Sequence, residues 1–197
     1  MLSPLLDSIV AFMLQLQILI HKGYMSSRGR IMSEEERITI INWIKNDIFD
    51  RFIPDICNRK HFILLYTDTT IIKPIWDILE RIIEKENLQG CKREPTLKHF
   101  IAYIPKGAWI QEHTDRNINE LIHCRFNIFL QCPPSNYITY YDGKKIEEKE
   151  GEYVFCRSGL DPHYSTVNEN DLERISISLG FLLPWEKVQE VYNKNKV

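Results

Sequence analysis

Two stretches in the first half of the chain carry apolar residues at helical spacing. In residues 33–52 an isoleucine recurs every three or four positions: Ile38, Ile41, Ile44 and Ile48. A Ser-x-x-Glu capping box at Ser33 precedes them, which predicts the start of a helix there. The second stretch, 73–90, has Pro74 in its first turn and Gly90 after its last apolar position. Amphipathic helices are therefore expected between about 34 and 90.

After residue 95 the pattern changes to short runs rich in aromatic and β-branched residues. These runs are TLKHFIAYIPKGAWIQEH, HCRFNIFLQC, NYITYYDGKKIEEKEGEYVFCR and RISISLGFLLP. Turn signals separate them, among them Pro133-Pro134, Asp142-Gly143 and Ser158-Gly159. Helices followed by strands predict an α+β domain in which the helices cover one face of a sandwich or barrel. A short helix is expected at the C-terminus, in WEKVQEVYNKNKV.

Two of the expected strands have one polar and one apolar face. In the last strand Arg174, Ser176 and Ser178 alternate with Ile175, Ile177, Leu179 and Phe181. In HCRFNIFLQC the polar positions are Arg125, Asn127 and Gln131, and the apolar ones are Phe126, Ile128 and Leu130. A wholly apolar interior would exclude such polar faces, whereas a barrel that encloses a ligand would use them.

Length and composition indicate one globular domain. The chain has 197 residues, of which 44% are hydrophobic and 26% charged, and its net charge is −2. That balance gives no broad cationic face for a phosphate backbone, so a nucleic-acid partner is not expected. Five cysteines without a Cys-x-x-Cys pair favour reduced thiols in a cytoplasmic protein.

The N-terminal residues form a separate segment in this interpretation. The apolar run IVAFMLQLQILI (9–20) has only twelve residues, too few to span a bilayer, and lacks the features of a signal peptide. It is expected to be a helix that packs on the domain or on a partner chain. Residues 21–30 resemble a linker. We therefore expect residues 1–31 to be dispensable and residues 32–197 to form a single domain.

The candidate chemistry is concentrated around His113 and Asp115 in AWIQEHTD. If this run is extended, side chains two residues apart point the same way, so both can reach one metal ion. A third ligand must come from elsewhere, and His163 in GLDPHYSTVN is the candidate. Two histidines and a carboxylate form the facial triad that holds iron(II). Alone, the His-x-Asp pair is equally compatible with a strand-end histidine hydrogen-bonded to its neighbour.

A further motif, Arg174-x-Ser176, follows eleven residues after His163. The order of His-x-Asp, distal His and Arg-x-Ser resembles the 2-oxoglutarate/iron(II)-dependent oxygenase superfamily. The resemblance covers roughly residues 97–184. It implies a double-stranded β-helix of the jelly-roll type at about 95–184, with the preceding helices packed on one sheet.

By the same resemblance, His113, Asp115 and His163 would hold iron(II), and 2-oxoglutarate and O2 would be the cosubstrates. The distal carboxylate of 2-oxoglutarate would pair with Arg174, assisted by Ser176. Three further residues would line or bind the cosubstrate pocket: Tyr103, Arg125 and Asn127. The implied reaction is hydroxylation of an unactivated C–H bond, with formation of succinate and CO2.

Other interpretations of these residues stay open. Arg125 and Asn127 are equally compatible with a strand surface near the acidic run KKIEEKEGE, which is itself interpreted as a solvated turn and edge strand. Tyr103 is equally compatible with a core aromatic residue. The histidines without a partner at metal-ligand spacing are interpreted as structural or solvated: His21, His61, His99 and His123. A cupin-like metalloenzyme that does not use 2-oxoglutarate, or a non-catalytic jelly-roll binding module, are the alternatives to an oxygenase.

Within the superfamily, the sequence favours an amino acid, another small molecule or a protein side chain as the substrate. The nucleic-acid-demethylating branch has a second arginine soon after the first and an asparagine before the tyrosine ahead of the ligand strand. Here those places read RISISLGF and HFIAYIP, without either residue. The loops 57–72 and 116–122 are expected to lie at the barrel mouth and to select the substrate.

Overall fold

Strands β6 (Ile122–Gln131) and β11 (Arg174–Leu183), of ten residues each, form the centre of the larger of two antiparallel sheets. The computed structural model describes residues 29–96, 98–134 and 137–194. In the larger sheet the strand order is β1-β9-β6-β11-β5-β3-β2, and β4 also pairs with β11. Its other strands are β1 (Gly29–Arg30), β2 (Ile53–Pro54), β3 (Lys60–Leu64), β4 (Lys92–Arg93), β5 (His99–Ile104) and β9 (Glu152–Cys156).

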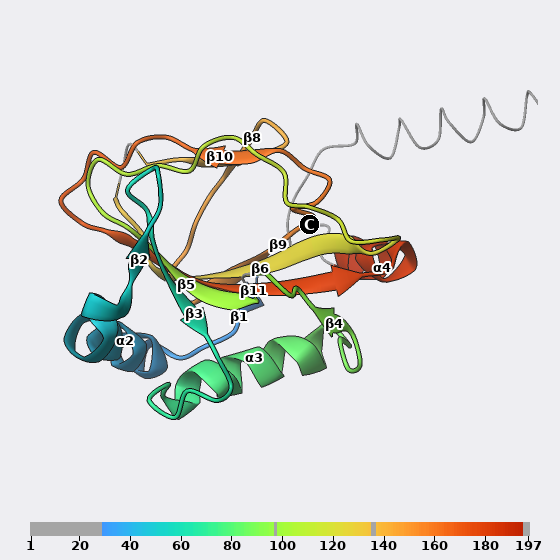
Figure 1. Cartoon of the computed structure of the whole chain (residues 1–197), viewed down its shortest axis with the longest axis horizontal. Coiled ribbons are helices and arrows are strands. Elements are labelled where there is room, and N and C mark those ends of the chain that lie inside the picture. Colours follow the sequence, from blue (N-terminus) through green and yellow to red (C-terminus); the bar gives the residue numbers. More distant parts are fainter. Residues whose placement is uncertain (1–28, 97, 135–136, 195–197) are drawn as a thin grey trace, which may run out of the picture.

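The smaller sheet lies across one face of the larger one (Figure 1). It has the order β10-β7-β8, with β7 at Thr139–Tyr141, β8 at Lys144–Ile146 and β10 at His163–Ser165. Residues 107–113 extend it, because their backbone forms hydrogen bonds with residues 163–168. Two facing antiparallel sheets preceded by helices are the α+β jelly-roll arrangement that the sequence predicts.

Helix α2 (Glu34–Trp43) begins at the predicted capping box, since the Ser33 hydroxyl accepts from the Glu36 amide and the Glu36 carboxylate accepts from the Ser33 amide. It continues as a π-helical turn (Ile44–Ile48) and a 3-10 turn (Phe49–Arg51). The predicted apolar stripe is wrong at one position, because Ile38 is 47% exposed. The buried face instead contains Ile40, Trp43, Ile44 and Ile48.

Helix α3 (Lys73–Lys85) has the predicted proline in its first turn and buries Ile75, Ile78, Leu79 and Ile82. The helix ends at Lys85, earlier than the end near Gly90 that the sequence predicts. Asn87 adopts a left-handed conformation with φ 51°, and Gly90, with φ 77°, lies in the turn that follows. The expected C-terminal helix is present as α4 (Trp185–Lys194), which packs against β6 and buries Val188 and Val191.

The apolar faces of the central strands pack on the helices. Helices α2 and α3 lie on the face of the larger sheet that is remote from the smaller sheet (Figure 1). The main hydrophobic cluster joins these helices to Ile175, Ile177, Leu179 and Phe181 of β11. The predicted alternation of β11 is therefore confirmed, and its polar face is directed at the space between the two sheets. No helix in the described ranges combines the length and the apolar character that a bilayer span requires.

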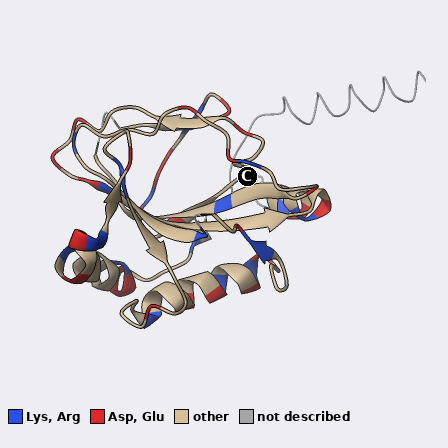
Figure 2. Cartoon of the chain, viewed as in Figure 1, with Lys and Arg blue, Asp and Glu red and all other residues tan. Residues whose placement is uncertain are grey.

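Both acidic and basic residues lie on α2 and α3 (Figure 2). Glu36 of α2 pairs with Arg81 of α3 at 2.5 Å between carboxylate oxygen and guanidinium nitrogen, which joins the two helices. Both side chains of this pair are partly exposed, so the pair is worth at most about 1 kcal/mol. Burial of the apolar faces, not surface charge, therefore holds the helices on the sheet.

Strand β1 places the start of the folded domain before residue 32. Gly29 and Arg30 pair with Tyr153 and Glu152 of β9, and Ile31 is buried. Residues 29–31 are thus part of the larger sheet and its core. The expected helix at 9–20 lies outside the described residues.

We predict that a chain starting at Ser33 is less stable than one starting at Gly29. The shorter chain loses β1 and the burial of Ile31 and Met32, which are 7% and 2% exposed. Two buried side chains of this size contribute about 3–5 kcal/mol together. Chemical denaturation of the two chains measures the difference, and equal unfolding free energies would show that β1 contributes nothing.

Two histidines on neighbouring strands, the half-buried His61 and the buried His99, are held neutral. Burial, reinforced by the charge of Arg59, lowers the pKa of His61 to about 4. Burial, reinforced by Arg93, lowers the pKa of His99 to about 3. The Nδ1 of His99 accepts a hydrogen bond from the Gly180 amide at 3.2 Å, which places the proton on Nε2.

The lowered pKa values predict loss of stability in acid. A histidine with pKa near 6.5 in the unfolded chain takes up a proton there first, so acid favours unfolding between pH 6.5 and the lower folded-state pKa. Each such histidine contributes a slope of about 1.4 kcal/mol per pH unit. We expect His99→Asn, which keeps an acceptor for Gly180 but cannot be protonated, to flatten the dependence of unfolding free energy on pH by that amount. An unchanged slope between pH 4.5 and 6.5 would contradict the assignment.

Candidate active site

A pair of reciprocal backbone hydrogen bonds brings the two candidate metal-binding histidines together. The amide of His113 donates to the carbonyl of His163 at 3.1 Å, and the amide of His163 donates to the carbonyl of His113 at 2.9 Å. Residues paired directly opposite one another on adjacent antiparallel segments have neighbouring side chains. The two imidazole centroids are accordingly 4.2 Å apart.

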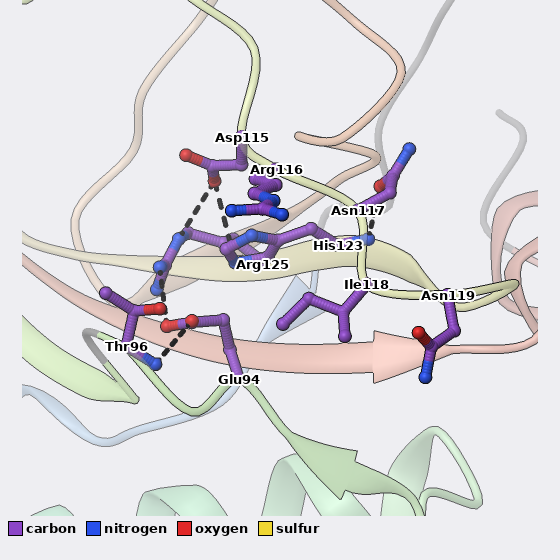
Figure 3. Close-up of a pocket in the computed structure, with 9 residues that line it drawn as sticks. All are labelled: Glu94, Thr96, Asp115, Arg116, Asn117, Ile118, Asn119, His123 and Arg125. Carbon is purple, nitrogen blue, oxygen red and sulfur yellow. Dashed lines mark hydrogen bonds and ion pairs between the residues drawn. The ribbon is translucent and has the colours of Figure 1, made fainter.

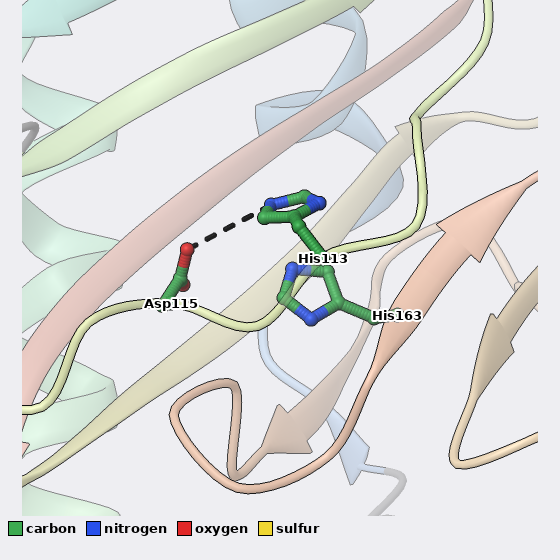
Figure 4. Close-up of side chains that lie close together, drawn as sticks. All are labelled: His113, Asp115 and His163. Atoms are coloured by element: carbon green, nitrogen blue, oxygen red, sulfur yellow. Dashed lines mark ion pairs between the residues drawn. The ribbon is translucent and has the colours of Figure 1, made fainter.

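Asp115 completes the predicted cluster (Figure 4). Its segment stays extended after His113, because the Asp115 amide donates to the Ser158 carbonyl at 2.8 Å. Both side chains therefore lie on the same side of the chain. One donor atom from each of His113, Asp115 and His163 lies within 4.8 Å of the other two. The sequence prediction that these three residues converge is confirmed.

The donor set fits a divalent metal ion. The Nδ1 atoms of His113 and His163 lie 2.7 and 3.2 Å from the carbonyl oxygens of Gln111 and Asp161. Each Nδ1 therefore carries a proton, which leaves Nε2 as the nitrogen that would bind a metal ion. Burial, together with the charge of His113, lowers the pKa of His163 to about 4, so this imidazole is neutral at pH 7. Two imidazoles and a carboxylate match the ligands of non-haem iron(II).

Arg125 orients the carboxylate of Asp115. The Nε of Arg125 lies 3.2 Å from Oδ2 of Asp115, and the Nε2 of His123 lies 3.6 Å from the same oxygen. The other oxygen, Oδ1, faces the Nε2 of His113 at 3.8 Å. Burial raises the pKa of Asp115, but Arg125, His123, His163 and a hydrogen bond from the Ser158 hydroxyl together outweigh burial, so the pKa lies below its usual value. Asp115 is thus ionised at neutral pH.

Arg125 lies beside the cavity and not on the strand surface. It is not a surface cation near KKIEEKEGE, because it is 5% exposed and its second carboxylate partner is Glu94, at 3.5 Å. Its guanidinium also lies over the Phe100 ring, 4.8 Å from the centroid. Room for it comes from Gly180 on β11, where a Cβ atom would lie 2.8 Å from Arg125 Nη1 and 2.5 Å from the Lys98 carbonyl. Arg125 faces the cavity at the metal-ligand end.

Asn127 lies on the same face of β6 and contacts a residue that the sequence interpretation missed. Its side-chain amide donates to the hydroxyl of Tyr141 at 2.8 Å. Tyr141 stacks on the imidazole of His163, with centroids 5.2 Å apart and an angle of 18° between the rings. The pairing of β7 with β10 sets Tyr141 opposite His163. The contact between Tyr141 and His163 depends on which strands pair, and a single run of sequence does not reveal that pairing.

Arg174 and Ser176 lie side by side on β11, as expected. The Nη1 of Arg174 donates to the Ser176 hydroxyl at 2.8 Å, and both residues line the cavity. The opposite edge of the guanidinium binds Glu148, with Nε–Oε2 and Nη2–Oε1 distances of 2.9 Å each. Glu148 was expected to be solvated, but its side chain is 8% exposed. A sequence gives no signal for this, since the acidic run looks like a surface turn.

Two polar residues of the expected pocket face elsewhere. Tyr103 lies on the helix side of β5, where its ring packs on Phe49 and its hydroxyl donates to Glu173 at 2.8 Å. Gln131 also binds Glu173, because a β-bulge at Ile175/Ser176 shifts the register there. The same bulge sets Phe129 opposite Ser176.

A narrow cavity of about 60 Å³ connects the three candidate ligands to Arg174. Arg125, Asn127, Tyr141, Ser176 and Ser178 line it between the two ends. A second cavity, of about 380 Å³, lies on the other side of Asp115 (Figure 3). Residues 115–119 form one wall of it, and Glu94, Thr96, His123 and Arg125 form the other. Asp115 and Arg125 therefore separate a small polar chamber from a wider opening.

Comparisons with known proteins identify the fold. No family model matches the sequence, and no curated protein matches it. Solved structures do match. A viral collagen prolyl hydroxylase from Paramecium bursaria Chlorella virus-1, in complex with 2-oxoglutarate, aligns with a TM-score of 0.61 and 17% identity over 81% of this chain and 96% of that one.

Two other similar structures come from bacteria. A prolyl-4-hydroxylase from Pseudomonas putida aligns with a TM-score of 0.58 and 14% identity, over 80% of this chain and 91% of that one. HygX from Streptomyces hygroscopicus, with nickel and 2-oxoglutarate bound, aligns with a TM-score of 0.58 and 8% identity, over 81% and 84%. The chain thus has the double-stranded β-helix fold seen in 2-oxoglutarate/iron(II)-dependent oxygenases.

We predict that His163→Ala abolishes tight binding of a divalent metal, whereas His123→Gln retains it. His163 offers a donor atom to the cluster, whereas the ring of His123 only faces Oδ2 of Asp115 and offers no atom to the cluster. Loss of a direct ligand should weaken binding more than about 100-fold, beyond the 10–100-fold that outer contacts typically cost. Calorimetric titration with Co²⁺ measures both. Equal losses in the two variants would show that the ligand set is misassigned.

Proposed function

We propose that this chain is a 2-oxoglutarate- and iron(II)-dependent dioxygenase. Its reaction would hydroxylate an unactivated C–H bond of an amino acid, another small molecule or a protein side chain. One observation carries the proposal: His113, Asp115 and His163 converge at one end of a cavity whose other end holds the buried guanidinium of Arg174. That arrangement suits a metal ion and a dicarboxylate bound together.

The proposed roles of the residues follow from their contacts. His113, Asp115 and His163 would hold the metal ion, which when bound supplies the oxidative chemistry. Arg125 holds the carboxylate of Asp115 in one orientation, and Tyr141 holds the ring of His163 by stacking. Ser176 fixes one edge of Arg174. Ser178, whose buried hydroxyl has no hydrogen-bond partner among the described residues, is available to a bound carboxylate or water.

The wider cavity beside Asp115 is the proposed route for the primary substrate. It meets the metal-ligand cluster at Asp115 and is lined by residues 116–119, within the loop expected to select the substrate. At about 380 Å³ it is within the usual size range of small-ligand sites. A free amino acid or a single side chain of a peptide fits this description, and the proposal includes both.

A second candidate is a jelly-roll metalloenzyme that does not use 2-oxoglutarate. The pairing of Arg174 with Glu148 favours it, because the guanidinium already has a carboxylate partner within the protein. The two candidates differ in whether an oxoacid binds at the metal.

The deciding measurement is made without oxygen. For the oxygenase, iron(II) plus 2-oxoglutarate should give a weak visible charge-transfer band, since the oxoacid chelates the metal. Under air the same mixture should release succinate, and Asp115→Asn or His163→Ala should reduce that release to background. A wild-type chain that binds iron(II) but gives no band with any oxoacid would favour the second candidate.

A further inference from the structure

The guanidinium of Arg174 is enclosed and largely satisfied by the protein itself. Arg174 is 4% exposed, and its planar group lies 5.4 Å from the centroid of Phe129 and 5.8 Å from that of Tyr137. Ser176 accepts from Nη1, and Glu148 accepts from Nε and Nη2. The positive charge is therefore fully compensated by one carboxylate, in a side-on bidentate pair.

Glu148 is itself held in place. Its Oε1 accepts a hydrogen bond from the Thr139 hydroxyl at 2.7 Å. It lies in the segment between β8 and β9, residues 147–151, whose end is fixed by Gly151 donating to the Phe129 carbonyl. Glu150 in the same segment pairs with Arg37 of α2 at 2.9 Å. This segment therefore carries Glu148 to the Arg174 end of the cavity.

The cavity is small while this pair persists. Its volume is about 60 Å³, well below the 300 Å³ or more of typical ligand sites. Two carboxylates on one buried guanidinium would also leave one negative charge uncompensated, which is strongly unfavourable in a desolvated site. An incoming dicarboxylate must therefore separate Glu148 from Arg174.

We infer that Glu148 is a built-in competitor for the distal carboxylate of the cosubstrate and sets the selectivity of the site among oxoacids. The inference rests on the proposed function. While Glu148 is paired, an oxoacid without a distal carboxylate, such as pyruvate, meets no competition at Arg174. A 2-oxo dicarboxylate binds only at the expense of the ion pair. The pair therefore weakens binding of 2-oxoglutarate specifically.

The test compares Glu148→Gln with Glu147→Gln, a matched change at an exposed neighbour whose side chain is 68% exposed. Anaerobic titration of the iron(II)-loaded chain with 2-oxoglutarate and with pyruvate gives affinities from the charge-transfer band. Glu148→Gln should tighten 2-oxoglutarate by about tenfold or more, the scale of one charged hydrogen-bonded contact. Its affinity for pyruvate, and both affinities of Glu147→Gln, should stay within about twofold of wild type. Unchanged or weaker binding of 2-oxoglutarate to folded Glu148→Gln would overturn the inference.

A measurement on the wild-type chain keeps the inference testable if Glu148→Gln does not fold. Hydrogen exchange of residues 144–152 should become faster when 2-oxoglutarate is bound, because displacement of Glu148 releases the segment. Pyruvate should leave that exchange unchanged. Slower or equal exchange with 2-oxoglutarate would contradict displacement.

Failure of this inference and failure of the proposed function give different results. If neither oxoacid produces a band with the wild-type chain or with Glu148→Gln, the oxygenase proposal fails and the inference fails with it. If both oxoacids bind and Glu148→Gln does not tighten the dicarboxylate, the oxygenase proposal stands and Glu148 is a structural partner of Arg174.

Discussion

The reciprocal backbone bonds between His113 and His163 are the constraint on which the candidate site depends. They join two segments that are separated by strands β6 to β9, and they fix the separation of two imidazoles through the backbone. Asp115 lies beside the two histidines because side chains two residues apart on an extended chain point to the same side. The candidate ligand cluster is therefore a product of this backbone pairing, and any change that opens the pair separates the three side chains.

Much of the architecture could be predicted because it depends on local periodicity. The capping box at Ser33, the proline of α3 and the alternation in β11 are patterns within a few residues, and all three were found in the structure. The convergence of the ligands could be anticipated from motif order. Features that depend on partners far along the chain could not: the bulge that turns Gln131 away, the stacking of Tyr141 and the buried pair of Glu148.

The error over Glu148 has a physical cause. An acidic run between lysines favours solvent when judged alone, since each carboxylate pays a large desolvation cost on burial. A buried arginine reverses that balance, but the two residues are 26 positions apart. Arg125 follows the same principle, with Glu94 and Asp115 as its partners. Cationic side chains inside this barrel thus determine which acidic residues are buried.

The two faces of strand β11 have different roles. Its odd-numbered residues from 175 to 181 belong to the hydrophobic cluster shared with the helices, and Arg174, Ser176 and Ser178 line the cavity. Substitutions on the apolar face should change the free energy of unfolding, and substitutions on the polar face should change which ligand the cavity prefers. Substitutions at a few inward positions could therefore change which ligand this cavity accepts, while the apolar face that packs on the helices stays the same.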